Sequence, residues 1–158
     1  MIPDRGTVLI DGHDLHGEPI AARGRLRFLA QRDAPPQGVS GVELVEFHAE
    51  LLRASPADVE AAMARTGLGA ALTHLVSTYS VGMFRRLQLA CLALGTPGLV
   101  VLDEPFAGLD QGAREALRAQ LISWSNAGVA LLLATHDEGL EDVLGRDVTD
   151  ITCLSPES

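Results

Sequence analysis

The feature that most constrains the fold is a pair of uninterrupted apolar segments, Leu99 to Leu102 and Val129 to Ala134. Continuous apolar strands are typical of a parallel sheet that is covered on both faces. A third segment, Arg25 to Ala30, alternates in polarity, so three of its residues can share one face of a strand: Leu26, Phe28 and Ala30. A shorter segment, Thr7 to Gly12, predicts a weaker strand that ends in a turn.

Helical patterns occupy the intervals between these strands. Apolar residues recur at three- and four-residue spacing from Val42 to Leu52, and Ser55-Pro56 starts a helix that Gly67 ends. Two more helices are expected, from about Val81 to Leu94 and from about Gln111 to Ser125. The last of these carries three large apolar residues on one side: Leu117, Leu121 and Trp124.

Helices that alternate with buried strands indicate an α/β domain with a parallel sheet. The stretch from residue 35 to residue 95 breaks this alternation, because it contains helical patterns only. We therefore expect an α/β core made of residues 1–34 and 96–158, with an all-helical subdomain, residues 35–95, inserted into it.

The composition limits the classes of partner. The chain of 158 residues carries a net charge of −9 at pH 7, and all 12 basic residues are arginines. Such a chain is a poor match for a nucleic-acid backbone, so we expect no nucleic-acid partner. The two cysteines have no metal-type spacing, which favours reduced thiols in a cytosolic protein. We expect neither a signal peptide nor a membrane span, since no apolar run approaches about 18 residues.

Polar side chains follow each of the three main strands. Asp103, at the carboxyl end of the first continuous segment, can hold Mg²⁺ through oxygen, and Glu104 can polarise an attacking water. His136 follows the second continuous segment, and Gln31 follows the alternating one. Neighbouring parallel strands bring their carboxyl ends to one edge of a sheet, so these side chains can face one ligand. Each of them alone is better explained by an ordinary surface position at a strand end.

A helix start with anion-binding character lies at Tyr79 to Met83, which reads YSVGM. Ser80 is well placed as an N-cap, and Gly82 leaves room for an anion close to the backbone. The unpaired N–H groups and the dipole of a helix start favour phosphate. An ordinary helix cap would give the same pattern.

Together these segments resemble the nucleotide-binding subunit of ABC transporters. Five motifs match, in the order of that family: Gln31 of the Q-loop, YSVGM of the signature motif, LVVLDEP of the Walker B strand, Ala107 to Asp110 of the D-loop and His136 of the H-loop. The separations also agree, because Ser80 stands 23 positions before Asp103. The longer signature, YSVGMFRRLQLA, is similar to that of ATPases of the ABC-2 exporter branch. The resemblance implies a P-loop NTPase (RecA-like) core that carries the helical subdomain of this family.

The chain departs from the family pattern at two places. Val81 stands where the signature has its first glycine, and its β-branched side chain lies near the expected approach of phosphate. The Walker A phosphate loop, G-x-x-x-x-G-K-[ST], requires a lysine, and the chain contains none. We therefore expect an N-terminally truncated subunit with a partial sheet, which lacks both that loop and the adenine-stacking aromatic and is inactive by itself.

The resemblance implies a role for each matched residue in a dimer that encloses two ATP molecules. Asp103 would position Mg²⁺, Glu104 would be the general base, and His136 would clamp the γ-phosphate. Gln31 would contact Mg²⁺ and sense that phosphate. The signature of the second subunit would bind the phosphate across the dimer, and Asp110 would link the two sites; the signature residues are Ser80, Val81, Gly82 and Met83.

The resemblance further implies a membrane permease as partner, on which the helical subdomain near Gln31 would dock. The expected location is therefore cytoplasmic, peripheral to the inner face of the membrane. Two alternatives remain open. The chain could be a non-catalytic partner that contributes only its signature helix to a complete subunit, although it retains Glu104 and His136. A chromosome-maintenance or DNA-repair ATPase is disfavoured, because the 49 positions between Gln31 and Ser80 hold no long coiled coil.

Overall fold

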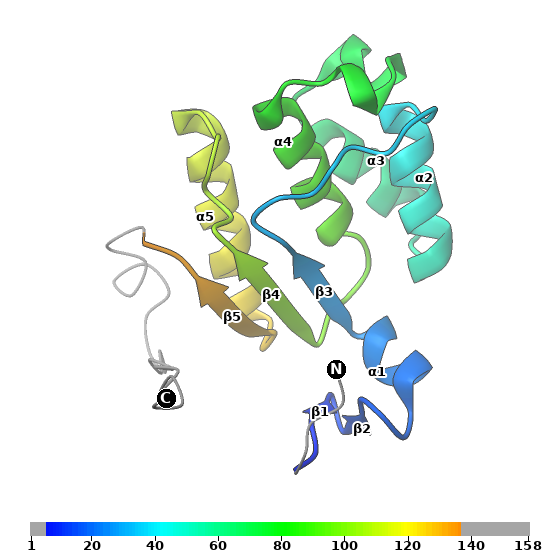
Figure 1. Cartoon of the computed structure of the whole chain (residues 1–158), viewed down its shortest axis with the longest axis vertical. Coiled ribbons are helices and arrows are strands. Elements are labelled where there is room, and N and C mark those ends of the chain that lie inside the picture. Colours follow the sequence, from blue (N-terminus) through cyan, green and yellow to red (C-terminus); the bar gives the residue numbers. More distant parts are fainter. Residues whose placement is uncertain (1–5, 137–158) are drawn as a thin grey trace, which may run out of the picture.

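The main sheet of the computed structural model, which describes residues 6–136, has three parallel strands. They lie in the order β3 (Leu26–Leu29), β4 (Leu99–Asp103) and β5 (Ala130–Ala134). All three arrows point the same way in Figure 1. The expected α/β class with a partial parallel sheet is confirmed.

Helices connect the strands as the apolar spacing predicted. Three helices and two short 3₁₀ turns lie between β3 and β4: α2 (Gly41–Leu52), α3 (Pro56–Arg65), η1 (Gly69–Thr73), η2 (Val76–Thr78) and α4 (Val81–Leu92). Helix α5 (Gln111–Asn126) connects β4 to β5. The two 3₁₀ turns were not expected, because they have no apolar periodicity of their own. Within residues 6–136, no helix is both long enough and apolar enough to cross a membrane.

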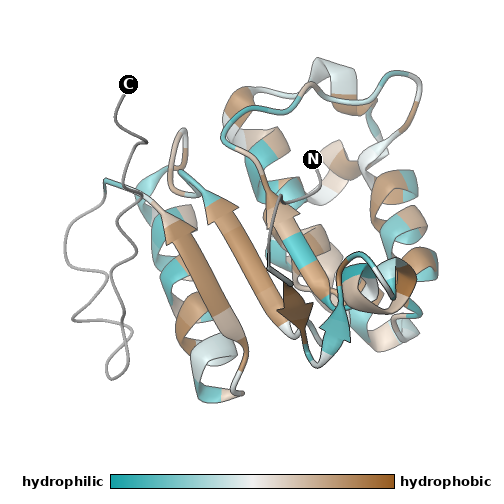
Figure 2. Ribbon diagram, turned by 60° about the horizontal axis from the view of Figure 1, so that its bottom comes forward, coloured by the Kyte–Doolittle hydropathy of each residue, from teal (hydrophilic) through white to brown (hydrophobic). Residues whose placement is uncertain are grey.

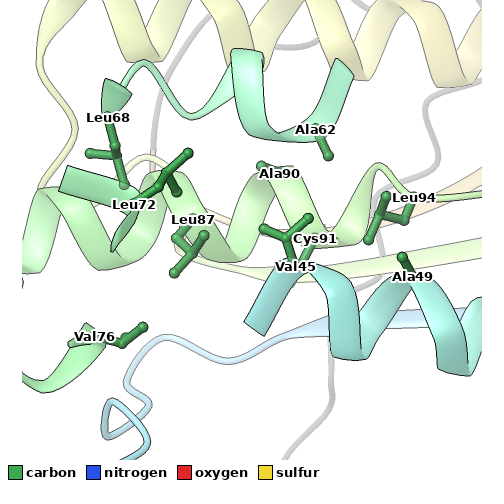
Figure 3. Close-up of a cluster of buried hydrophobic side chains, with 10 residues drawn as sticks. All are labelled: Val45, Ala49, Ala62, Leu68, Leu72, Val76, Leu87, Ala90, Cys91 and Leu94. Atoms are coloured by element: carbon green, nitrogen blue, oxygen red, sulfur yellow. The ribbon is translucent and has the colours of Figure 1, made fainter. Parts of the chain in front are cut away.

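Two hydrophobic clusters hold these elements together. The first lies among α2, α3, the 3₁₀ turns and α4, and Figure 3 shows its ten buried side chains: Val45, Ala49, Ala62, Leu68, Leu72, Val76, Leu87, Ala90, Cys91 and Leu94. The second lies between the sheet and α5, and its buried members are Leu29, Leu92, Val100, Leu102, Phe106, Leu117, Leu121 and Trp124. Helix α4 contributes to both clusters and therefore joins the helices to the sheet. The division of the chain into a core and an inserted subdomain stays a prediction.

A buried cysteine belongs to the first cluster. Cys91 is a free thiol, and its burial raises its pKa to about 12. The thiol is therefore protonated at neutral pH and inert toward reagents that need a thiolate. Cys153 lies outside the described residues.

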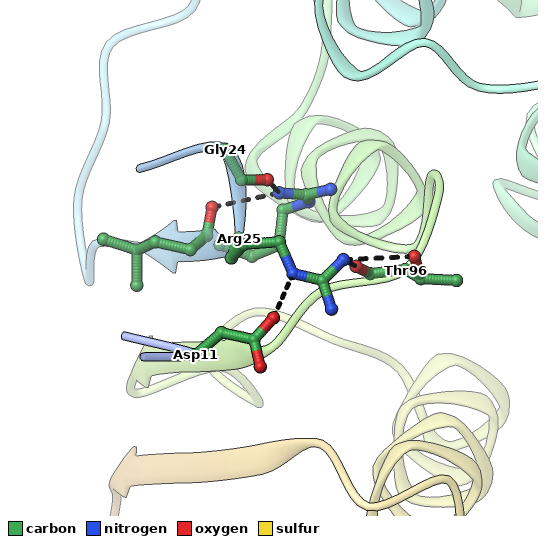
Figure 4. Close-up of polar contacts among 6 residues, drawn as sticks. Asp11, Gly24, Arg25 and Thr96 are labelled. Carbon is green, nitrogen blue, oxygen red and sulfur yellow. Dashed lines mark hydrogen bonds and ion pairs between the residues drawn. The ribbon is translucent and has the colours of Figure 1, made fainter. Parts of the chain in front are cut away.

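An N-terminal hairpin occupies the amino end of the sheet. Strands β1 (Leu9–Ile10) and β2 (His13–Asp14) pair antiparallel and are followed by the short helix α1 (Pro19–Gly24), which the sequence pattern did not indicate. Arg25 fastens this hairpin, because its Nε lies 2.6 Å from Asp11 Oδ2 while its Nη1 donates to the Thr96 carbonyl at 2.7 Å (Figure 4).

One face of the sheet is less covered than the sequence predicted. Leu26 and Phe28 do share a face of β3, but this face is left open by the helices, and the Phe28 side chain is 61% exposed. On β5, Leu132 lies on the same open face. Figure 2 shows β5 in front of α5, with the strands coloured as mostly hydrophobic. The described residues thus cover the continuous strands on one face only, where the sequence predicted cover on both.

Candidate functional site

The four polar residues that follow the strands lie at the carboxyl edge of the sheet. Asp103 is the last residue of β4 and pairs with Ala134, the last residue of β5. Glu104 follows directly, Gln31 lies two residues beyond β3, and His136 lies two residues beyond β5. The order β3-β4-β5 places them side by side, as the parallel arrangement predicted. We call these residues the edge group: Gln31, Asp103, Glu104 and His136.

Two members of the edge group are in direct contact. The Oε2 atom of Glu104 lies 2.9 Å from Nδ1 of His136. The Glu104 side chain is only 19% exposed, whereas that of His136 is 86% exposed. A largely buried carboxylate that touches an exposed imidazole can take a proton from a bound molecule and hold the ring in one orientation. The Gln31 residue is exposed and Asp103 is half-buried.

The backbone of Glu104 adopts a conformation that is rare for its residue type. Its φ is 45°, in the left-handed region, which costs about 1 to 3 kcal/mol for a residue with a side chain. Its N–H donates to the Ala134 carbonyl at 2.8 Å, and its carbonyl accepts from Ala107 N–H at 3.2 Å. This turn directs the chain away from β4 at the point where the carboxylate meets His136. Strained residues of this kind cluster at functional sites, which supports such a role for Glu104.

A buried arginine binds the backbone at the edge group. Arg85, on α4, donates to three backbone carbonyls: Ala30 at 2.8 Å, Gln31 at 3.0 Å and Glu104 at 3.2 Å. Burial lowers the pKa of Arg85, and the nearby charges of Asp33 and Asp103 act in the opposite direction. Arg85 was not among the site residues expected from the sequence. Its position in the helix could have indicated that it is buried. Arg85 lies seven residues before the buried Leu92, so the two residues share one face of α4.

The signature residues line a separate hollow. Its volume is about 250 Å³, and it is lined by Ser80, Gly82, Met83, Arg86, Gly108, Leu109 and Asp110. The start of α4 and the start of α5 both open onto it. The Ser80 hydroxyl accepts from Met83 N–H at 3.2 Å, and Asp110 Oδ1 accepts from Ala113 N–H at 2.8 Å. Both side chains therefore cap helices, and the members of the edge group do not line this hollow.

Val81 and Gly82 determine how closely α4 approaches the D-loop. A Cβ at Gly82 would lie 2.9 Å from the Gly108 carbonyl oxygen, so only glycine fits without movement. The Val81 side chain is exposed, and its Cγ1 would lie 3.3 Å from a Cβ at Gly108. Val81 thus packs beside the hollow, where the family pattern has a glycine.

The edge group is compatible with a magnesium-bound phosphate. Residues 6–136 contain no cluster of three or more His, Cys, Asp or Glu side chains that could enclose a metal ion. Magnesium does not need one, because it is commonly held by one or two carboxylates together with phosphate oxygens and water. Asp103 supplies one such carboxylate at the edge group. The helix start at Ser80 offers backbone N–H groups for a phosphate at the separate hollow.

Comparisons with known proteins identify similar chains. A family model described as "ABC transporter" matches residues 1–107. The chain is 36% identical over 138 residues to the daunorubicin/doxorubicin resistance ATP-binding protein DrrA of Streptomyces peucetius, covering 85% of this chain and 42% of that protein. It is 32% identical over 138 residues to the doxorubicin resistance ATP-binding protein DrrA of Mycobacterium tuberculosis, with the same two coverages. The chain therefore spans about two fifths of the length of these relatives.

Two solved structures are also similar. One, described as the ATP-binding subunit of an ABC transporter, has a TM-score of 0.78 and 27% identity over 86% of this chain and 58% of that one. The other, a putative ABC transporter ATP-binding protein from Pyrococcus furiosus, has a TM-score of 0.67 at 20% identity, over 85% of this chain and 66% of that one. At that identity the second supports the fold alone.

Proposed function

Because the chain belongs to the ABC transporter family, we propose that it is part of the ATP-binding and ATP-hydrolysing subunit of an exporter, powering a membrane permease. The observation that carries this proposal is the contact between Glu104 and His136 beside Asp103, at one edge of a parallel sheet. The likeness to drug-resistance ATP-binding proteins supports the exporter branch.

The proposed chemistry is hydrolysis of ATP to ADP and phosphate. Asp103 and Gln31 would hold Mg²⁺, which supplies charge neutralisation for the phosphates when bound. Glu104 accepts a proton from the attacking water, and its contact with His136 keeps the carboxylate in place. His136, which is exposed, donates to the terminal phosphate. Since the chain has no lysine and hence no Walker A loop of its own, it is inactive until a phosphate loop completes the site.

A dimer explains why the edge group and the signature hollow are separate. The hollow at Ser80, Gly82 and Asp110 would receive the phosphate of a nucleotide held by the partner subunit, with Val81 and Met83 at its border. The edge group of the same chain would serve the other nucleotide. Asp110 lines the hollow and caps α5, and it lies six positions after Glu104, so it would connect the hollow to the edge group.

An apolar groove beside the edge group suits a permease. It has a volume of about 410 Å³ and lies between β3, α2 and α4, with Phe28, Leu44, Leu51 and Phe84 among its lining residues. Phe47 and Leu51 on α2 are exposed, which leaves an apolar stripe for a partner. Through such a permease the chain would lie at the cytoplasmic face of the membrane.

A first experiment measures nucleotide binding by the purified chain. Without a phosphate loop, we expect weak binding of MgATP in a calorimetric titration, and Asp103→Asn should remove the magnesium dependence that remains. Tight binding of ATP with magnesium-dependent turnover by the chain alone would contradict the proposal that it is an incomplete subunit.

A second experiment separates the catalytic proposal from a non-catalytic partner that lends only its signature helix. In a complex with a permease and a partner ATP-binding subunit, and with a segment that carries the phosphate loop supplied to complete this chain's own site, we expect Glu104→Gln to lower the ATP turnover of that site by at least about 100-fold, the usual range for loss of a general base. Glu115→Gln, on the exposed part of α5, is the matched control and should leave turnover unchanged. Unaltered turnover in Glu104→Gln would favour the non-catalytic partner.

A further inference from the structure

Helix α4 is bonded to the ends of two strands at the point where the edge group lies. Arg85 is 5% exposed, and its guanidinium donates to the carbonyls of Ala30 and Gln31 after β3 and to that of Glu104 after β4. A second bond runs from Gln88 Nε2 to Asp33 Oδ2 at 3.0 Å, one turn further along α4. Helix α4 therefore holds the segment after β3 through both Arg85 and Gln88.

The Arg85 guanidinium holds three carbonyl oxygens in a fixed arrangement. A guanidinium is planar and rigid, so three carbonyls bound to its two terminal nitrogens are held at set separations. One of these carbonyls belongs to Glu104, whose left-handed backbone is unfavourable without support. The Glu104 N–H donates to the Ala134 carbonyl, and the Glu104 carbonyl also accepts from Ala107 N–H.

We infer that Arg85 is the positioning residue for Glu104: it holds the Glu104 backbone in its left-handed conformation and thereby keeps the carboxylate against His136. The inference deepens the proposed function, on which its catalytic meaning rests. Arg85 does not touch the reacting atoms and acts only through the backbone of Glu104. Because Ser80 and Arg85 lie on one helix, a displacement of the signature end of α4 also moves the support of Glu104.

The chain offers a closely matched control in Arg27. This arginine is 6% exposed and likewise donates to three backbone carbonyls, those of Gly24, Leu26 and Leu94, at 3.1 to 3.2 Å. It lies at the amino end of β3, opposite the edge group. A variant at Arg27 removes a buried arginine and its carbonyl contacts without changing any contact of Glu104.

The experiment compares Arg85→Gln with Arg27→Gln in the full chain without nucleotide. Backbone amide exchange is measured by NMR and expressed relative to the slowest core amides, so that global stability cancels. In Arg85→Gln we expect the Glu104 amide to exchange at least about tenfold faster on this scale, because local opening becomes easier. In Arg27→Gln the relative exchange of Glu104 should equal that of the wild type.

A second readout is the ring signal of His136, assigned by its loss in His136→Gln. In Arg85→Gln this signal should move to the position that it has in Glu104→Gln, where the carboxylate is absent. Arg85→Lys keeps the charge but has no planar fork, so we expect intermediate values in both readouts. This variant also serves if Arg85→Gln does not fold.

Equal behaviour of the Arg85 and Arg27 variants at Glu104 and His136 would overturn the inference and leave Arg85 as a purely structural residue. Since no nucleotide is present, this result is independent of whether the chain takes part in ATP hydrolysis. Unaltered turnover in Glu104→Gln would refute the proposed catalytic function. The role of Arg85 in holding the Glu104 backbone would be unaffected by that result.

Discussion

Gly82 shows how a single residue shapes the site. It lies in the first turn of α4, where the Gly108 carbonyl oxygen of the D-loop would be 2.9 Å from any Cβ. The absence of a side chain lets the helix start and the D-loop approach each other and close one side of the signature hollow. A preceding valine is tolerated, because the Val81 side chain points outward and remains exposed.

We therefore predict opposite effects for two glycine substitutions in helix first turns. Gly82→Ala should destabilise the fold by about 1 to 3 kcal/mol, because backbone atoms must move to admit the methyl group. Gly112→Ala in α5, where a Cβ meets nothing closer than Asp110 Oδ1 at 3.7 Å, should stabilise it by up to about 1 kcal/mol. Urea unfolding of both variants measures the difference. Equal stability of the two would show that Gly82 is not sterically restricted.

At the scale of single elements, side-chain caps define where α2 and α3 begin. The Ser40 hydroxyl accepts from Glu43 N–H, and the Glu43 carboxylate accepts from Ser40 N–H at 2.7 Å. Ser55 and Asp58 form the same capping box. The Ser40 N–H lowers the pKa of Glu43, and the Ser55 hydroxyl, followed by its N–H, lowers the pKa of Asp58. In both boxes the bonds favour the ionised carboxylate.

These shifts predict an acid-sensitive stability. A carboxyl group whose pKa is lower in the folded than in the unfolded chain stabilises the fold above its unfolded pKa, and this contribution is lost as pH falls through its folded pKa. We expect the unfolding temperature to fall below about pH 4, near the ordinary values of Asp and Glu. Thermal unfolding of the wild type and of Ser40→Ala/Ser55→Ala between pH 7 and pH 3 tests this. The variant should be less stable at pH 7 and should lose less on acidification.

At the scale of the whole molecule, the two faces of the sheet have different environments. Leu29 is 2% exposed and packs in the cluster beneath α5, whereas its neighbour Phe28 is 61% exposed on the open face. Phe28, Val101 and Leu132 are in register across the three strands, and so form an apolar surface that continues across the sheet. Such a surface favours association with another chain or segment.

Two adjacent substitutions in β3 should therefore behave differently. Leu29→Ala removes a buried side chain and should cost about 2 to 5 kcal/mol in the free energy of unfolding. Phe28→Ser should change that free energy by less than about 1 kcal/mol, while lowering the tendency of the protein to aggregate. Urea unfolding and light scattering on the two variants measure these effects. A loss in Phe28→Ser as large as that in Leu29→Ala would mean that the open face is covered in solution.

The sequence by itself determined the three strands of the main sheet, the four longer helices and their order. The apolar runs before Asp103 and His136 specify strands, since a strand buried in a parallel sheet has no polar face, and the caps at Ser55 and Ser80 specify helix starts. These signals come from residues that are close together in the sequence, so they can be recognised without knowledge of the fold. They also placed Asp103, Glu104, His136 and Gln31 at strand ends, because parallel strands share one carboxyl edge.

Only the tertiary structure decided which faces are covered and what supports the site. Alternation along β3 cannot tell which of its two faces meets the helices, and the buried face proved to hold Arg27 and Leu29. The left-handed backbone of Glu104 and the role of Arg85 depend on carbonyls that are 19 to 55 positions away in the sequence. Such contacts leave no periodic trace in the sequence, because they arise only when separate elements pack together.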